Sequence, residues 1–101
     1  MTVGWSRTAL DDREELLEIA FDRAKAQSDP QLYQAAVAQD DRIEAEGGAL
    51  DGIAIWQEGP LPDSHLYITR DGLFVILYRR DAATVNIERV LPSRSNWKPA
   101  P

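Results

Sequence analysis

The residues best suited to bind an anion lie in the last third of the chain. Five arginines are found there, and four of them, Arg79, Arg80, Arg89 and Arg94, lie on or after the last two predicted strands. The guanidinium group binds carboxylates and phosphates through a planar fork of N–H donors. Two arginines side by side on neighbouring strands, with no acid between them, would need an anionic partner. A contact with Glu88 inside the chain would serve the same purpose, so both interpretations stay open.

Three tryptophans are many for a chain of 101 residues. Trp5 alternates with polar neighbours and is expected in the core. Trp56 lies shortly before Gly59, in a segment whose structure the sequence does not decide, and an exposed aromatic side chain there would mark a groove for a partner protein. Trp97 follows Arg94 in a short polar tail.

The sequence gives little support for a metal site or for a catalytic triad. His65 is the only histidine, which excludes a site built from several histidines. Asp63, Ser64 and His65 are the residue types of a hydrolytic triad, but three successive residues of one loop rarely converge on a substrate. His65 is therefore interpreted as a turn or strand-edge residue. The acids between residues 40 and 46 are expected on a solvated helix face, and we expect no metal and no cofactor.

The N-terminal half predicts one strand and one long helix. Val3 and Trp5 alternate with polar residues from Thr2 to Arg7, which is typical of a half-buried strand. A helix is predicted from Thr8 to Gln27, with Thr8 and Asp11 forming a capping-box pattern. Its apolar stripe is expected to consist of Leu10, Leu16, Leu17, Ala20, Phe21 and Ala24.

A second helix is predicted after a very short connection. Asp29 is a capping residue, and Pro30 suits the first helical position because the missing N–H has no partner there. Gly47 and Gly48 end the helix. The short connection makes the two helices antiparallel neighbours, and their shared apolar face needs a flat surface to pack on.

A three-stranded meander from His65 onward supplies that surface. Asp71 and Gly72, between two apolar runs, predict a hairpin with a type I′ turn. Residues 73–78 are apolar on both faces and are expected to form the central strand, and residues 85–91 form the last strand, which Pro92 ends.

The predicted fold is therefore α+β, in the order β-α-α-β-β-β. An N-terminal strand is followed by a two-helix antiparallel hairpin packed on an antiparallel sheet with a C-terminal three-stranded meander. Residues 1–98 are expected to form a single domain, and residues 99–101 a frayed tail.

Composition excludes several classes of protein. The absence of cysteine rules out disulfides and thiolate metal sites. The net charge of −6 argues against non-specific electrostatic binding of nucleic acid. No apolar run approaches the roughly 20 residues that span a bilayer, and the first residues lack a signal-peptide pattern. We expect a cytoplasmic protein with no membrane contact.

The charge is unevenly distributed along the chain. Residues 1–52 contain twelve acidic and five basic residues, whereas residues 53–101 contain five acidic and six basic ones. A solvated acidic helix face explains this distribution. The alternative is that the nearly neutral C-terminal half carries the functional surface.

Several short motifs, in this order and spacing, resemble toxins of the RelE/ParE superfamily from type II toxin–antitoxin systems. The similarity covers nearly the whole chain and is closest to the ParE branch. The motifs are Val3-Gly4-Trp5-Ser6 with Ala9-Leu10, then Asp40 with Arg42-Ile43-Glu44, then Tyr78-Arg79, Thr84 to Leu91 and Ser93-Arg94.

The resemblance implies one of two activities. The RelE branch cleaves messenger RNA on the ribosome without a metal, and uses basic and tyrosine side chains to activate the 2′-hydroxyl. The ParE branch poisons DNA gyrase. Both branches are silenced by a cognate antitoxin, through which the toxin contacts DNA only indirectly. The resemblance places Arg94 and Trp97 in the segment that acts on or contacts the target; packing of Trp97 on the sheet and pairing of Arg94 with an acid is the alternative.

This chain departs from the nuclease branch at two places. Val75 occupies the position where that branch has an arginine, and the loop before the meander contains no lysine. Metal-free cleavage needs cations to stabilise the developing charge and a group to accept the proton. A nuclease built on this chain would depend on Arg94, Arg79 and Tyr78.

We therefore expect a ParE-like toxin that binds its target, with plasmid stabilisation and growth arrest as the implied roles. The residues expected to contact the target or the antitoxin are Arg79, Arg80, Arg89, Arg94, Trp97 and Trp56. One alternative is a ribosome-dependent endoribonuclease acting on messenger RNA. The other is a degenerate member of the family that binds its antitoxin and poisons nothing.

Overall fold

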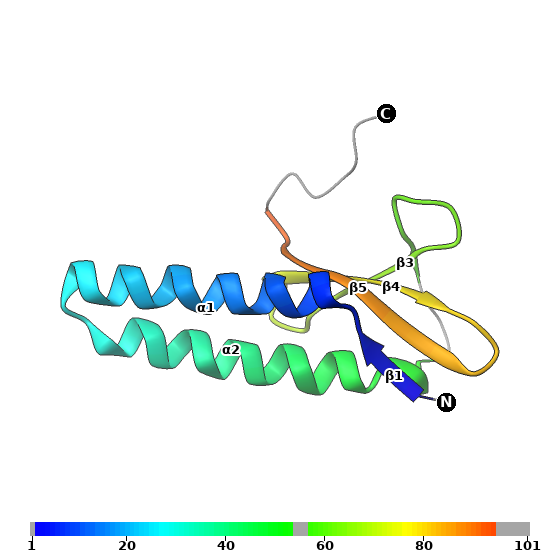
Figure 1. Ribbon diagram of the computed structural model, residues 1–101, viewed down its shortest axis with the longest axis horizontal. Coiled ribbons are helices and arrows are strands. Elements are labelled where there is room, and N and C mark those ends of the chain that lie inside the picture. Colours follow the sequence, from blue (N-terminus) through cyan, green and yellow to red (C-terminus); the bar gives the residue numbers. More distant parts are fainter. Residues whose placement is uncertain (1, 54–56, 95–101) are drawn as a thin grey trace.

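The computed structural model describes residues 2–53 and 57–94, so Trp56, Trp97 and the expected frayed tail lie outside the described residues. The elements follow the predicted order (Figure 1). They are β1 (Thr2–Trp5), α1 (Arg7–Gln27), α2 (Pro30–Gly48), the short 3-10 helix η1 (Leu50–Gly52), β2 (Gln57–Glu58), β3 (His65–Ile68), β4 (Phe74–Arg80) and β5 (Thr84–Pro92). The predicted α+β class is confirmed, and β2 is an addition to it.

The sheet is mixed rather than purely antiparallel. Its strand order is β1-β5-β4-β3-β2, and β1 runs parallel to β5 while the other neighbours are antiparallel. The parallel pair arises because the helical hairpin forms the crossover between β1 and the rest of the sheet. β4 is the central strand, as predicted, and Phe74 to Tyr78 are all buried.

The first helix begins earlier than its capping-box pattern predicts. Ser6 is the N-cap: its hydroxyl oxygen accepts a hydrogen bond from the Ala9 amide at 3.0 Å. The Ser6 amide donates to the Ile87 carbonyl at 2.8 Å, and the Ser6 hydroxyl donates to the Glu88 carbonyl at 2.9 Å. The sheet therefore holds Ser6 in an extended conformation, and the helix starts at Arg7. Asp29, in contrast, caps α2 as predicted, by accepting from the Gln31 amide at 3.1 Å.

The predicted type I′ turn at Asp71-Gly72 is wrong. Of these two residues only Gly72 has a positive φ, of 76°, and the last hydrogen-bonded pair before the loop is Thr69 with Phe74. The Asp71 carboxylate accepts hydrogen bonds from the Thr69 hydroxyl at 2.6 Å and from the Leu73 amide at 3.0 Å. These bonds hold Asp71 in a wider four-residue loop, which a two-residue turn would not allow.

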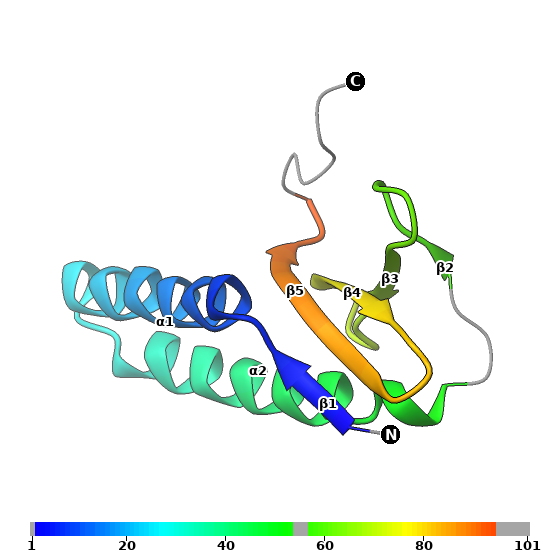
Figure 2. The ribbon, with the colours of Figure 1, turned by 45° about the vertical axis from the view of Figure 1, so that its right-hand side comes forward.

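Both helices lie on one side of the sheet, and their far halves extend beyond it (Figure 2). This explains why Phe21, toward the far end of α1, is 49% exposed; it packs edge-on against Tyr33 of α2 with ring centroids 5.6 Å apart. Leu10, also predicted in the apolar stripe, is 43% exposed although it lies in the first turn of the helix, where the neighbouring Ala9 is the residue that enters the core. The buried cluster between helices and sheet consists of Ala9, Ile43, Leu50, Phe74, Ile76, Tyr78, Val85, Ile87 and Val90.

A β-bulge in β5 shapes this core. Ile87 pairs with Tyr78 and Arg89 pairs with Leu77, so Glu88 is one residue too many for its partner strand. A bulge changes which face of the sheet the following side chains point to. Ile87 and Val90, three residues apart, are therefore both buried in the same cluster.

None of the helices in the described ranges is long and apolar enough to cross a membrane.

Candidate functional site

The arginine side chains of the sheet form contacts with other residues of the same chain. Arg79 forms an ion pair with Glu88 and donates a hydrogen bond to the Pro62 carbonyl at 2.9 Å. The contact with Glu88 was one of the two interpretations that the sequence left open. Arg80 donates to the Ile53 carbonyl at 3.2 Å. These two side chains already have partners, so an outside anion would compete with internal contacts.

Arg89 forms hydrogen bonds with the first helix. Its Nε and Nη2 atoms donate to the two carboxylate oxygens of Asp12 at 2.9 and 3.1 Å, and these hydrogen bonds raise the pKa of Arg89 above its ordinary value. Asp12 also accepts from the Val90 amide at 2.9 Å. One carboxylate therefore joins α1 to β5 at the part of β5 that extends beyond β1.

The three residues expected for a nuclease do not form one cluster. Tyr78 is 1% exposed and belongs to the core beneath the helices; burial raises the pKa of its hydroxyl above the ordinary value. The His65 ring lies 5.5 Å from the Tyr78 ring, and His65 lies in β3, in line with its interpretation as a strand residue. Arg79 is paired with Glu88, and Arg94 follows the end of β5.

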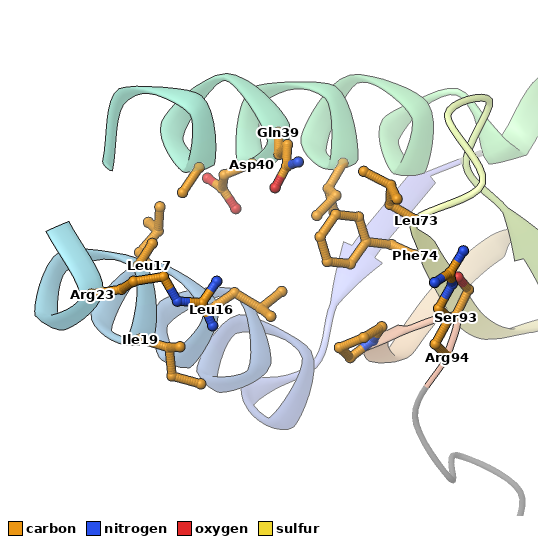
Figure 3. A pocket seen from close by; sticks show the side chains of 14 residues that line it. Leu16, Leu17, Ile19, Arg23, Gln39, Asp40, Leu73, Phe74, Ser93 and Arg94 are labelled. Atoms are coloured by element: carbon orange, nitrogen blue, oxygen red, sulfur yellow. The ribbon is translucent and has the colours of Figure 1, made fainter. Parts of the chain in front are cut away.

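Arg94 lies instead at an apolar groove of about 450 Å³ between α1, α2 and the end of the sheet (Figure 3). The apolar lining comes from both helices and from the start of β4 and end of β5. It consists of Leu16, Leu17, Ile19, Ala20, Ala36, Ile43, Leu73, Phe74 and Pro92. The polar lining consists of Arg23, Gln39, Asp40, Ser93 and Arg94. Such a surface, apolar inside and polar at its margin, is typical of sites that bind a partner or ligand.

The acid in this groove is neutralised by the protein itself. Arg13 donates from Nε and Nη2 to Asp40 at 2.8 and 3.0 Å, and from Nη2 to Glu44 at 3.2 Å. The hydrogen bond with Asp40 raises the pKa of Arg13 above its ordinary value. The Arg13 guanidinium also lies 4.6 Å from the centre of a Trp5 ring. Arg13 is thus held between the strand and α2.

The ion pairs of Arg13 with Asp40 and Glu44 also affect a possible cation site. Asp40, Asp41 and Glu44 have carboxylate oxygens within 4.8 Å of one another, but Arg13 already supplies positive charge to two of the three. Asp41 and Glu44 are exposed, as expected of a solvated face. Asp40 is only 19% exposed, and Glu46 accepts hydrogen bonds from the Tyr67 hydroxyl and the Arg70 amide, so the solvated face does not include these two acids.

Two arginines, Arg23 and Arg94, line the groove. Five arginines form ion pairs with acids of the described residues, namely Arg7, Arg13, Arg42, Arg79 and Arg89. Within residues 2–53 and 57–94, neither Arg23 nor Arg94 has such a partner. Sequence reasoning identified Arg94 by its position after the last strand but missed Arg23. Its spacing from Leu16 and Ile19, which places it on the same helical stripe, was the available signal.

Comparison with known proteins shows the fold. The chain is similar to a chain of the solved structure described as "Chromosomal ParDE TA system from P. aeruginosa", with a TM-score of 0.68 and 17% sequence identity, over 91% of this chain and 95% of that one. No family model matches the sequence, and no curated protein matches it. The overall fold is therefore shared with a chain of a ParDE system.

Proposed function

We propose that this chain is the toxin component of a type II toxin–antitoxin module, that it is ParE-like, and that a cognate antitoxin neutralises it. The observation that carries the proposal is the likeness in fold to a chain of a ParDE system, which extends over nearly the full length of both chains. The sequence motifs from the first strand to Arg94 support the same assignment independently of the fold.

We propose further that the chain acts by binding, with DNA gyrase as the target. Three observations favour binding over RNA cleavage. The Tyr78 hydroxyl belongs to a side chain that is 1% exposed, Arg79 is paired with Glu88, and Val75, at the position of an arginine in the nuclease branch, is itself 1% exposed. A general acid or base must reach its substrate within hydrogen-bond distance, and a buried tyrosine does not.

The expected partners follow from this role. An antitoxin binds the chain directly, and DNA is contacted only through that antitoxin. A cytoplasmic location suits a protein that meets gyrase. Trp56 and Trp97, which lie outside the described residues, remain proposed contact residues together with Arg94.

Induced expression in a bacterial host tests the proposal. Growth, the DNA-damage response and the integrity of messenger RNA are followed in the same culture. Growth arrest with a DNA-damage response and intact messages is the expected result, and inhibition of purified gyrase in a supercoiling assay would establish the target.

Two results would overturn parts of the proposal. Arrest with cleaved messages, lost on Arg94→Ala, would identify a ribosome-dependent endoribonuclease. Folded protein at high level with no arrest would identify a degenerate member that binds an antitoxin and poisons nothing. Arg7→Ala is the matched control for Arg94→Ala, because Arg7 is an exposed arginine whose carboxylate partner, Asp11, is also well exposed.

A further inference from the structure

A second hollow, the outer hollow, lies on the side of the helical hairpin that faces away from the apolar groove. It has a volume of about 390 Å³ and is lined by Glu14, Leu17, Glu18, Phe21, Asp22 and Tyr33. Glu18 of the outer hollow and Ala20 of the groove are two residues apart, so they point to roughly opposite sides of α1. We propose that the outer hollow binds an arginine-rich segment of a partner protein.

An aromatic pair forms most of the apolar part of the outer hollow. The Phe21 ring packs edge-on against the Tyr33 ring with centroids 5.6 Å apart, and Phe21 is 49% exposed. Phe21 lies toward the end of α1 and Tyr33 near the start of α2, in the half of the hairpin that extends beyond the sheet (Figure 2). The face of an aromatic ring attracts cations through its quadrupole, so an exposed ring favours a positively charged partner group.

A lysine of the chain already uses this attraction on one side of the pair. The Lys25 Nζ atom lies 5.7 Å from the centre of the Phe21 ring. Phe21 and Tyr33 also line a neighbouring hollow at the tip of the hairpin, and Lys25 lines that hollow but not the outer one. The described residues that line the outer hollow include no lysine and no arginine. The side of the pair that faces the outer hollow is therefore available to a cation from outside.

Three uncompensated acids beside the aromatic pair indicate which cation fits. Glu14, Glu18 and Asp22 are exposed, and none of them takes part in the ion pairs found within residues 2–53 and 57–94. A guanidinium group can bind a carboxylate through its fork of N–H donors and can also stack on an aromatic ring. Carboxylates and rings in one hollow therefore favour arginine.

The acids also disfavour other occupants. Nucleic acid is itself negatively charged, and a second copy docked hollow to hollow would bring carboxylates against carboxylates, which lowers affinity. In the described part of the chain, the group of carboxylates close enough to share a metal ion is formed by Asp40, Asp41 and Glu44, none of which lines the outer hollow. A segment with several separate positive charges satisfies both the acids and the rings.

The spacing of the acids sets the spacing of the arginines. Glu14, Glu18 and Asp22 follow one another at intervals of four residues in α1, so each carboxylate lies about 6 Å further along the helix. Side chains on one face of an extended chain repeat every two residues, or about 6.6 Å. Arginines at every second position of an extended segment would therefore meet the three acids in turn. This inference does not rest on the proposed function, because no step of it depends on toxicity.

Titration of the isotope-labelled full chain with a defined peptide tests the inference. In this peptide arginine alternates with serine on both sides of one central leucine, and a matched peptide carries glutamine in place of arginine. Amide chemical shifts are followed by NMR at about 0.1 M salt, where distant charges are screened. The shifts should change most in residues 14–22 and around Tyr33, and the glutamine peptide should not bind.

Two triple variants separate specific pairing from general attraction to an acidic protein. E14Q/E18Q/D22N should weaken binding of the arginine peptide by about tenfold, as expected for the loss of three exposed ion pairs. The matched control is D41N/D51N/E58Q, which removes the same amount of negative charge at three exposed acids outside the outer hollow. This control should weaken binding by less than about twofold, because those charges are screened from the hollow.

The aromatic contribution is tested at the pair itself. Phe21→Leu keeps an apolar side chain but removes the ring face, so affinity should fall about twofold to fivefold. Tyr33→Phe keeps the ring and should bind like the wild type. Every substituted position is at least partly exposed, so each variant is expected to fold, which circular dichroism checks.

Several outcomes would overturn the inference. Equal weakening by the two triple variants, shift changes away from the outer hollow, or no effect of Phe21→Leu would each exclude the proposed mode. A dimer in light scattering that E14Q/E18Q/D22N disrupts would assign the hollow to a second copy, and tighter binding of spermine at the same residues would assign it to a small polycation. Growth arrest in the expression test together with failure of these binding tests would reject this inference and leave the proposed function intact.

Discussion

Two neighbouring aspartates of α1 differ in their contribution because of what surrounds each carboxylate. Asp12 is 11% exposed and accepts hydrogen bonds from the Arg89 side chain and from the Val90 amide. Asp11 pairs with Arg7 in an i,i+4 arrangement, and both side chains are more than half exposed. Water screens the pair of Asp11 with Arg7, so this pair contributes almost nothing to the free energy of unfolding. Asp12 is shielded from water and also accepts a hydrogen bond from a backbone N–H.

Asp12→Ala is therefore expected to destabilise the protein by about 1–3 kcal/mol, because it leaves the Val90 N–H and the Arg89 guanidinium without their acceptor. Asp11→Ala should change the free energy of unfolding by less than about 0.5 kcal/mol. Urea denaturation followed by tryptophan fluorescence measures both. Equal effects of the two substitutions would contradict the structural role assigned to Asp12.

At the scale of elements, the end of α2 is held against the first strand by close packing. A Cβ added at Gly47 would lie 2.6 Å from the Trp5 ring, closer than atoms tolerate, whereas one at Gly48 would meet nothing within 4 Å. The two adjacent glycines thus have different roles. Gly47 makes room for Trp5, and Gly48 only lowers the intrinsic stability of the helix.

Gly47→Ala and Gly48→Ala should consequently act in opposite directions. Overpacking is expected to make Gly47→Ala destabilising by about 1–3 kcal/mol, even though alanine has the higher helix propensity. Gly48→Ala should be neutral or stabilising by up to about 1 kcal/mol. Thermal and urea unfolding of the pair measures the difference, and a stabilised Gly47→Ala would show that Trp5 moves aside at little cost.

For the whole molecule, two loop aspartates link stability to acid pH. The hydrogen bond from the Thr69 hydroxyl, followed by that from the Leu73 amide, lowers the pKa of Asp71 below its ordinary 3.8. The Ala83 amide and then the Thr84 hydroxyl lower the pKa of Asp81 in the same direction. Folding therefore favours the ionised form of both groups.

The stability that these groups contribute is fully present above about pH 4 and is lost as the pH falls through their lowered pKa values. The double variant D71N/D81N should be less stable than the wild type at pH 5, and the difference should shrink by pH 2.5. Urea midpoints at a series of pH values measure it. If the urea midpoints of the two proteins change with pH in the same way, the two loop aspartates do not determine how stability depends on acid pH.

The order of elements was predictable because its signals are local. Asp29 and Pro30 start α2, the two glycines at 47 and 48 end it, and the run from 73 to 78 is apolar on both faces as a central strand requires. The turn at Asp71 was mispredicted, since the hydrogen bond from the Thr69 hydroxyl depends on how the strands meet. Of the arginines that the sequence proposed as contact residues, Arg94 lies at the groove, whereas Arg79, Arg80 and Arg89 have partners within the chain.

The sequence by itself determined the α+β class, the helical hairpin and the central strand, because caps, breakers and apolar periodicity act within a few residues of one another. Only the tertiary structure decided that β1 pairs in parallel with β5, that Glu88 forms a bulge, and that Arg23 and Arg94 share an apolar groove. These features join residues up to 82 positions apart, as in the pairing of Thr2 with Thr84, and the ion pair of Arg89 with Asp12 joins distant parts of the chain in the same way. Local patterns do not specify which distant partner a strand or a charge will meet, since that choice depends on how the layers pack.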